Sequence, residues 1–443
     1  MTDLAMTAGR DVTRRQVWAW YAYDFGNSAY AAVVLLAVYA VYFKDQVVGG
    51  IEGVRLWGLA VGLAMLVVAV TSPVLGVIAD YSGSKKRFLL FYTVMSVLFT
   101  AALFFATPGN VVVGMGCFVL AEIGYRSAQV FYNGLLPEIA RPEEIGRISG
   151  NGWAIGTVGG IVCLLIVLPL IVLQQQGVIA LEGTVVVRLT MVITAVFFAL
   201  SAIPIFLWLP ERARANQLPP GETYLSMAFK RLRHTFQTAR QYKEFLKYML
   251  AFLVYNEGVM MALNFSAIIG AVLFGMEQQD LIVFMIVVQI TNVIGAYGFG
   301  VWMDKVGGKL VLVAALLLMI AAVTAMYFAQ TTLHFYMVGA AAGVAIAGLQ
   351  SVSRTMVGLF SPPRQSAEFY GFFAVTGRAS SFIGPAIFGY VAAEVALYYE
   401  GLGETAVVAE QLGQRSAILT IGLFLLGGLL LLTRVNGMKG RGN

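Results

Sequence analysis

The charged residues that lie within the long apolar stretches of this chain include Asp24, Glu122, Arg126, Glu257, Arg354, Arg378 and Glu394. By insertion scales, an ionised side chain at the centre of a membrane helix costs at least ~2.5–3.5 kcal/mol, so such a group faces a partner or a water-filled cavity. A carboxylate in such a place can take up and release a proton, and an arginine can hold a carboxylate through two hydrogen bonds. These residue types therefore indicate a site for a charged or polar solute.

The first carboxylate, Asp24, lies three residues before Asn27, so both side chains occupy adjoining positions on one helical face. Two interpretations stay open. The carboxylate takes up protons or binds a substrate amine, or it forms a pair between helices that only fixes their packing. Asn256 and Glu257 follow a tyrosine much as Asp24 does, so we expect each half of the chain to present one carboxylate.

Glu122 and Arg126 are four residues apart and can form an ion pair along one helical face. The pair either only neutralises two membrane charges, or it is broken when a proton or a substrate carboxylate competes for Arg126. Arg378 has no acidic partner in its own helix. We expect its guanidinium to bind a substrate carboxylate, the alternative being a salt bridge to Glu257 or Asp24.

Other polar residues of the apolar stretches could line the same site, although amides and hydroxyls also link membrane helices without binding a ligand. The expected substrate-binding set is Asp24, Asn27, Tyr132, Asn133, Asn256, Glu257, Asn292 and Arg378, and the expected coupling or ion-pair set is Asp24, Glu122, Arg126 and Glu257. Trp18, Trp20 and Tyr21 are expected to be interfacial anchors. Neither histidine suggests a metal site, and no cofactor is expected.

The composition shows what must position these residues. Apolar residues make up 59% of the 443 residues and charged residues 12%, whereas a soluble domain has about 45–50% and about 25%. Twelve apolar runs suit helices that cross a ~30 Å hydrocarbon core. They cover residues 18–43, 56–79, 88–106, 111–136, 149–173, 187–209, 245–274, 281–301, 310–328, 333–360, 369–398 and 417–432.

The 29 basic residues are distributed unevenly along this pattern. Most of them fall in segments that face the cytoplasm if the first helix enters from that side. The positive-inside rule then predicts that both termini are cytoplasmic. The basic character of the chain follows from this topology and from contact with anionic membrane lipids, so no nucleic-acid partner is expected.

A pattern of glycine and aspartate occurs twice, 224 residues apart. Its members are Gly76, Asp80 and Gly83 in the first copy and Gly300, Asp304 and Gly307 in the second. Glycines 152 and 159 recur as glycines 377 and 384, at an offset of 225. A repeat of half the chain in apolar surroundings is typical of transporters whose halves move against each other around a central site. We predict an N-terminal six-helix half at 1–209, a cytoplasmic linker at 210–243 and a C-terminal half at 244–443. Residues 224–247 are expected to form an amphipathic helix on the membrane surface, the alternative being a flexible tether.

The repeated pattern resembles the loop between helices two and three of the major facilitator superfamily. That resemblance implies an all-α membrane fold of twelve helices in two pseudo-symmetric halves. It also implies that Asp80 and Asp304 latch the opposite half and close the cytoplasmic side. Gly76 and Gly300 are expected to allow close helix packing. The expected latch set is Gly76, Asp80, Gly83, Gly300, Asp304, Arg354 and Glu368.

Four longer segments carry a narrower resemblance. They are WAWYAYDFGNSAY (18–30), YNGLLPEIARPEEIGRISGNGWAIGTVGG (132–160), YNEG (255–258) and GLQSVSRTMVGLFSPPRQSAEFYGFFAVTGRASSFIGP (348–385). Together they resemble the vacuolar amino-acid effluxer branch of the superfamily, which includes autophagy-linked permeases. The resemblance covers nearly the whole chain and implies export of neutral amino acids.

We therefore expect a secondary active transporter in the plasma (inner) membrane that moves a small polar solute by alternating access, with a proton as coupling ion. The chain has no Walker-type phosphate-binding motif, so direct ATP drive within it is not expected. The rival class is a membrane receptor or scaffold that keeps the fold without transporting. An enzyme is not expected, because no cluster of nucleophile, base and metal ligands stands out.

The latch hypothesis predicts the effect of removing either repeated aspartate charge. Asp80→Asn or Asp304→Asn should shift the population towards the state open to the cytoplasm and lower transport without preventing membrane insertion. Accessibility labelling of cysteines introduced at cytoplasmic positions measures that shift. Unchanged labelling together with unchanged flux in both variants would show that these residues are not a latch.

Overall fold

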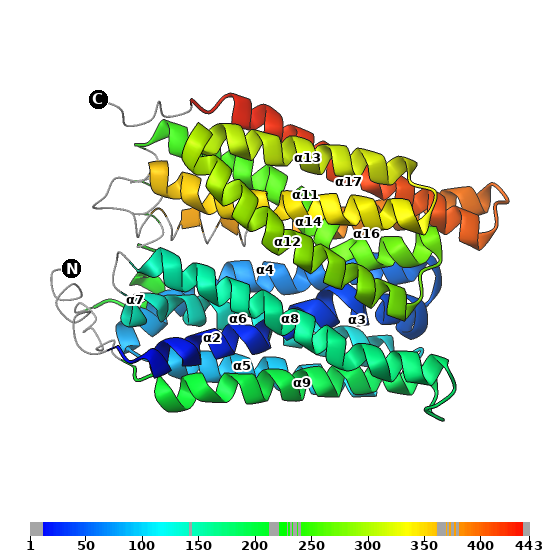
Figure 1. Cartoon of the computed structure of the whole chain (residues 1–443), viewed down its shortest axis with the longest axis horizontal. Helices are drawn as coiled ribbons and strands as arrows, with labels where there is room; N and C mark the ends of the chain where they lie inside the picture. The colour runs from blue at the N-terminus through cyan, green and yellow to red at the C-terminus, as the bar shows by residue number, and fades with distance from the viewer. Residues whose placement is uncertain are drawn as a thin grey trace. The chain divides into compact units, whose positions relative to one another are not determined.

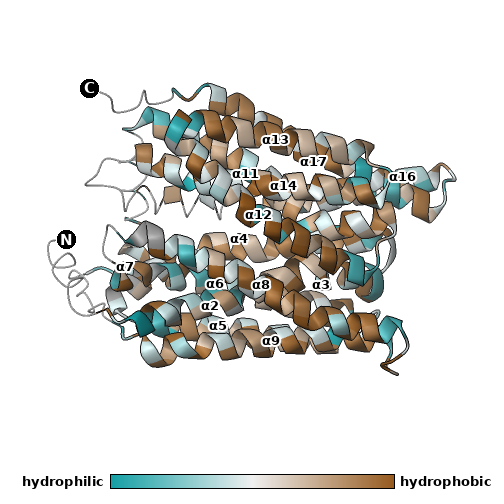
Figure 2. Ribbon diagram, viewed as in Figure 1, coloured by the Kyte–Doolittle hydropathy of each residue, from teal (hydrophilic) through white to brown (hydrophobic). Residues whose placement is uncertain are grey.

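The computed structural model describes residues 12–140, 144–211, 221–227, 229–230, 233, 237, 241–360, 369, 372–373, 376–377 and 381–436. Every regular element in this part of the chain is a helix. Apolar residues line the middle of the helices, and hydrophilic residues gather near their ends (Figure 2). This distribution suits helices that satisfy their own backbone groups in lipid, and it confirms the predicted all-α membrane fold.

Most of the helices are long compared with those of soluble proteins, and only α3 and α7 among the described helices are short. In chain order they are α2 (Arg14–Tyr30), α3 (Tyr39–Tyr42), α4 (Gly50–Ser82), α5 (Lys85–Ala102), α6 (Val111–Gly134), α7 (Leu136–Ile139), α8 (Ile145–Gln175), α9 (Gly183–Trp208), α11 (Lys243–Phe274), α12 (Gln278–Val306), α13 (Gly308–Phe328), α14 (Thr332–Phe360), α16 (Ile383–Gly401) and α17 (Ala406–Thr433). A π-helical segment at Ala31–Ala37 lies between α2 and α3, and a second one at Phe43–Val48 continues the run beyond α3. A 3-10 turn at Leu103–Phe105 extends α5. Among the described residues, eleven helical segments are long and apolar enough to cross a membrane.

The remaining long helix, α16, begins later than the predicted span of 369–398. Residues 381 and 382 form a bend, and the regular helix starts at Ile383. The Ser381 hydroxyl donates to the main-chain oxygen of Gly377 at 2.7 Å. A break inside an apolar run leaves hydropathy unchanged, which is why the apolar count missed it.

The last helix, α17, begins eleven residues before the predicted start at 417. Its first turns carry polar residues that an apolar count excludes. Glu410 accepts a hydrogen bond from Lys44 at 2.6 Å, and Arg415 donates to the main-chain oxygens of Tyr327 and Ala329. These partners satisfy the polar side chains, so the segment is helical despite its composition.

The chain divides into two compact units, each described here by itself. Unit 1 comprises Met1–Tyr42 and Val70–Phe229, and unit 2 comprises Phe43–Ala69 and Lys230–Asn443. In unit 1, α2 packs against α8 and α9, and α5 packs against α6 and α9 (Figure 1). In unit 2, α11 and α16 pack against α17, and α14 packs against α12 and α13. These units follow spatial contact, whereas the predicted halves follow the sequence repeat.

The first part of α4 belongs to unit 2 because it packs closely on α16. A side chain at Gly58 would overlap the main-chain oxygen of Pro385, and one at Gly389 would lie 2.7 Å from the main-chain oxygen of Val54. Arg55 adds a 2.5 Å ion pair with Glu394 of α16. Glycine on both helices therefore allows the backbone approach that small-residue interfaces give in membranes.

The recurring glycines make matching contacts in the two units. A side chain at Gly159 of α8 would overlap the main chain of Phe25 in α2. A side chain at Gly384 of α16 would lie 2.6 Å from a carboxylate oxygen of Glu257 in α11. The glycines are 225 residues apart and their partners are 232 apart, so each unit packs the corresponding helices at the same glycine position.

This packing predicts that replacing two glycines of unit 1 by alanine has different effects on thermal stability. Gly159→Ala places a methyl group 2.6 Å from the main-chain carbon of Phe25, and such overpacking typically costs about 1–3 kcal/mol. Gly116→Ala meets nothing within 4 Å and gains helix propensity. Thermal unfolding in detergent should show a lower Tm for Gly159→Ala only. Equal values for the two variants would contradict the close contact.

Candidate functional site

The Asp24 carboxylate lies on the face of α2 that meets α8. A side chain at Gly156 would lie 2.7 Å from an Asp24 carboxylate oxygen and 2.8 Å from the Ser28 hydroxyl. Asp24 is half-buried, and Asn27, three residues on, is buried with its carbonyl oxygen lacking a hydrogen-bond partner. Glycine at position 156 therefore makes room for a polar surface on α2.

The helix contacts also show which residue of α11 corresponds to Asp24. At the 232-residue offset of those contacts, Asp24 corresponds to Asn256, and Glu257 corresponds to Phe25. The expected carboxylates of the two halves, Asp24 and Glu257, therefore lie one position apart when the two helices are aligned by these contacts. Because neighbouring helical residues point about 100° apart, the two acids face different surroundings within their units.

Glu122 and Arg126 form the ion pair that their spacing allows. Arg126 Nε donates to Glu122 Oε1 at 2.7 Å. The Glu122 side chain is 0% exposed, and its second oxygen makes no hydrogen bond. The guanidinium carbon of Arg126 lies 5.1 Å from the centre of the Tyr125 ring, which stacks on Tyr30 with 4.6 Å between ring centres. The pair is thus built into a wall of aromatic rings between α2 and α6.

Sequence reasoning missed Tyr30. Its hydroxyl is buried beside Glu122, close enough to interact with that carboxylate, and makes no well-formed hydrogen bond. Buried polar groups are usually hydrogen-bonded, and an exception calls for a specific explanation. The helical spacing of Tyr30 from Asn27 is the signal that could have drawn attention to it, because both lie on one face of α2.

Glu257 of α11 binds the start of α16. Its Oε2 atom accepts a hydrogen bond from the main-chain N–H of Gly384 at 2.7 Å, in the first turn of α16. The residue is 1% exposed, and its other oxygen lacks a partner. No described basic side chain forms an ion pair with it. The helix N-terminus, with its free N–H groups and positive dipole end, stabilises this carboxylate instead.

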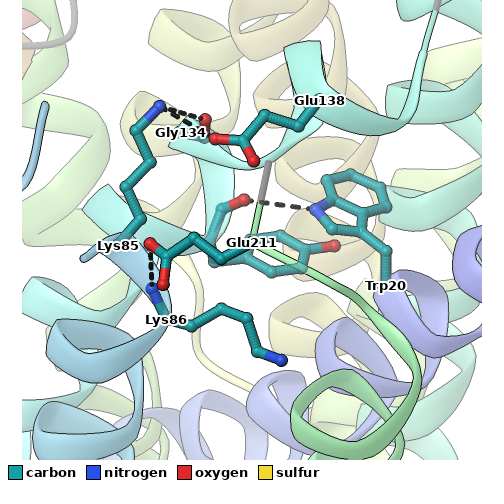
Figure 3. Close-up of polar contacts among 7 residues, drawn as sticks. Trp20, Lys85, Lys86, Gly134, Glu138 and Glu211 are labelled. Atoms are coloured by element: carbon teal, nitrogen blue, oxygen red, sulfur yellow. Dashed lines mark hydrogen bonds and ion pairs between the residues drawn. The ribbon is translucent and has the colours of Figure 1, made fainter. Parts of the chain in front are cut away.

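The other predicted binding residues are distributed among different surroundings. Tyr132 is buried and stacks on Trp20 with 4.4 Å between ring centres, and Trp20 donates to its main-chain oxygen at 3.2 Å (Figure 3). Trp20 is therefore a core residue, and its predicted interfacial role is wrong. Asn133 is exposed, while the buried carbonyl oxygen of Asn292 has no partner.

Asn256 and Arg378 are the remaining residues of the predicted binding set. Asn256 donates weakly to the main-chain oxygen of Gly377, at 3.5 Å. Arg378 lies outside the described residues, so its role stays a prediction.

For the two aspartates of the predicted latch, the structure gives the position of the backbone only. Asp80 lies in the last turn of α4 and Asp304 in the last turn of α12, and their side chains are outside the description, as is Glu368. Arg354 is exposed on α14. Gly76 and Gly300 meet nothing within 4 Å, so the close packing expected at these glycines is absent.

The other repeated glycines have a clear structural reason. Gly83 has φ +59° and Gly307 has φ +90°, in the region that favours glycine. The pattern thus ends a helix in the same way in both copies.

A lysine after each copy of the pattern binds the end of another helix. Lys86 Nζ donates to main-chain oxygens at the carboxyl end of α9, including that of Phe206 at 3.0 Å. Lys309 Nζ donates to the main-chain oxygens of Thr433 at 3.3 Å and Val435 at 2.5 Å, at the carboxyl end of α17. Cations stabilise the unpaired carbonyls and negative dipole end of a helix there.

Two acidic residues complete this end of unit 1 (Figure 3). Lys85 forms a 3.1 Å ion pair with Glu138 and donates to the main-chain oxygen of Gly134. Glu211 accepts the main-chain N–H of Lys86 at 3.1 Å. Partial burial raises the pKa of the Glu211 carboxyl, and that hydrogen bond opposes the rise. These contacts join α5, α7 and α9 at one end of the unit.

The amino-acid sequence of the chain is similar to those of known proteins. A family model described as "Vacuole effluxer Atg22 like" matches residues 57–396. The MFS-type transporter YxiO of Bacillus subtilis (strain 168) is 27% identical over 382 residues, which cover 85% of this chain and 88% of that protein. Autophagy-related protein 22 of Coccidioides immitis (strain RS) is 21% identical over 388 residues, covering 71% of this chain and 63% of that longer protein.

Solved structures show the same fold. A bacterial homologue of the human lysosomal transporter Spinster, in an inward-facing and unoccupied conformation, has a TM-score of 0.69 at 16% identity, covering 94% of this chain and 96% of that chain. The nucleoside transporter NupG has a TM-score of 0.69 at 13% identity, covering 98% and 99%. At these identities the likeness establishes the architecture alone.

The contact between Glu257 and α16 predicts how two substitutions differ in stability. Glu257→Leu leaves the buried N–H of Gly384 without an acceptor, which typically costs about 1–3 kcal/mol. Glu257→Gln keeps an amide oxygen that can accept the bond and removes a buried charge. Thermal unfolding in detergent should give a lower Tm for the leucine variant only. A glutamine variant as unstable as the leucine variant would contradict this account of the contact.

Proposed function

Because the chain belongs to the Atg22-like vacuole effluxer family, within the MFS-type transporters, we propose that it carries a small polar solute by alternating access and couples that movement to protons. Transport by an integral membrane protein is the activity that the family supports. Neutral amino acids are the solute class that the segments shared with the effluxer branch favour.

The observation that carries the coupling proposal is the environment of Glu257. The carboxylate is 1% exposed, no described cation neutralises it, and one of its oxygens lacks a partner. A buried charge of this kind is unfavourable unless it is paired or takes up a proton. The residue is therefore suited to binding a proton in one step of a cycle and releasing it in another.

The place and orientation of the carrier belong to the same proposal. The excess of basic residues in alternate loops favours cytoplasmic termini, with the chain in the plasma (inner) membrane. Asp24, which is half-buried on α2, is the second candidate proton carrier, because it too is a carboxylate within a membrane-spanning segment.

Reconstituted protein tests this function directly. Proteoliposomes should accumulate a transported solute when a pH gradient is imposed. If Glu257 or Asp24 carries the proton, Glu257→Gln or Asp24→Asn should abolish accumulation and keep exchange of internal for external solute. Glu244→Gln is the matched control, since Glu244 lies in the first turn of the same helix as Glu257 and pairs there with Lys247.

The outcomes distinguish the alternatives. Accumulation by both Glu257→Gln and Asp24→Asn would show that neither residue carries the proton. Failure of the wild-type protein to move any solute of a broad panel, while it remains folded, would favour a receptor or scaffold over a carrier.

A further inference from the structure

We propose that the two terminal nitrogens of Arg126, beside Tyr125 and Glu122 in unit 1, bind the carboxylate of a zwitterionic substrate. This inference rests on the proposed transport function and names the substrate class and the atoms that select it. It assigns Glu122 two roles: one oxygen holds the guanidinium, and the other accepts from the substrate's ammonium group.

The ion pair with Glu122 uses Nε of Arg126 and leaves its two terminal nitrogens without a described hydrogen bond. Glu122 accepts from Nε of Arg126 at 2.7 Å, and the described part of the chain gives Arg126 no other hydrogen bond or ion pair. The Arg126 side chain is 21% exposed, whereas that of Glu122 is 0% exposed. The buried carboxylate therefore fixes one edge of the guanidinium, and the fork formed by the two terminal nitrogens stays accessible. That planar fork matches a carboxylate through two parallel hydrogen bonds.

The position of Arg126 excludes lipid as the natural neighbour of this fork. The residue lies 15 positions after the first residue of α6 and 8 before the last, well inside the helix. A cation at that depth is unfavourable against hydrocarbon and faces a polar space or a partner instead. The Tyr125 ring, 5.1 Å from the guanidinium carbon, further orients it.

Unpartnered polar atoms beside the pair point independently to a ligand. The second oxygen of Glu122 and the Tyr30 hydroxyl are both buried without a hydrogen-bond partner. Asn27, one turn earlier than Tyr30 on α2, also has a buried oxygen without a partner. These are mostly acceptors, or groups that can accept, and an ammonium group supplies donors that they lack.

Charge balance selects a zwitterion over a simple anion. The pair of Glu122 and Arg126 has no net charge, so a lone carboxylate would leave one uncompensated negative charge in this low-dielectric place. A zwitterion brings its own ammonium and adds no net charge.

Binding measurements on the purified full-length protein test the assignment. Neutral L-amino acids are screened by thermal shift, and one that binds is compared by calorimetry with its amide, which lacks the carboxylate, and with the acid that lacks the amine. The amino acid should bind at least about tenfold more tightly than either analogue, the loss expected when a charged hydrogen-bonded group is removed.

Substitutions locate the site. Arg126→Lys should weaken amino-acid binding at least about tenfold, because an ammonium keeps the charge and loses the fork. Arg188→Lys is the matched control, since Arg188 also lies in unit 1 and, among the described residues, donates to the main-chain oxygens of Thr184 and Phe104 alone. It should bind as the wild-type protein does. Loss of binding in Arg378→Lys with full binding in Arg126→Lys would overturn the proposal and place the carboxylate at Arg378.

Glu122→Gln gives a test that survives poor folding of Arg126→Lys. Removing the negative charge leaves the empty site with a net positive charge, so the preference should shift from the amino acid to the acid that lacks the amine. A merely structural role for Glu122 would not reverse that preference, and an unchanged preference would overturn the proposal. Uptake of a solute without a carboxylate would also overturn it while leaving the transport function intact, whereas binding without uptake would contradict transport alone.

Discussion

The ion pair between Glu122 and Arg126 places two opposite charges in the interior of α6, where hydrocarbon would make either charge alone unfavourable. The same constraint governs every polar group that the helices carry into the membrane. Many of them find a partner within the protein, and a partner on another helix fixes a contact between the two helices. Glu257 accepts from the main-chain N–H of Gly384 at the start of α16, and Arg415 donates to main-chain oxygens at the end of α13. Polar residues therefore determine where helices begin and which helices meet.

Several of these contacts occur in both copies of the internal repeat. The left-handed glycines Gly83 and Gly307 end corresponding helices, and the lysines that follow bind the carboxyl ends of α9 and α17. Gly159 and Gly384 bring the corresponding helices of each unit into contact at equivalent positions. The groups that face these glycines differ. Gly159 faces the main chain of Phe25 in unit 1, and Gly384 faces the carboxylate of Glu257 in unit 2. The two units thus share the same close helix contact but differ in the charged groups that lie at it.

The helices and their fold class follow from the sequence because length and hydropathy are local properties. Residues whose polar groups are satisfied by distant partners are harder to predict. The early start of α17 depends on Lys44 meeting Glu410, and the late start of α16 depends on a bend within an apolar run. The partner of Glu257 is a main-chain group, which no pattern of side chains reveals. Tyr30 was missed because a buried tyrosine is ordinary in sequence and becomes unusual only when its hydroxyl lacks a partner.

Charge movement on a solid-supported membrane tests the central claim most directly, that the chain moves a zwitterionic solute together with protons. Proteoliposomes adsorbed on the sensor are exposed to a rapid jump in the concentration of a neutral amino acid. A zwitterion carries no net charge, so a transient current that grows with solute concentration and is absent from protein-free vesicles would report the coupled proton. The account predicts such a current. Folded protein that takes up the amino acid without any current at any pH would contradict proton coupling, and a flat trace without uptake for every amino acid would contradict the account as a whole.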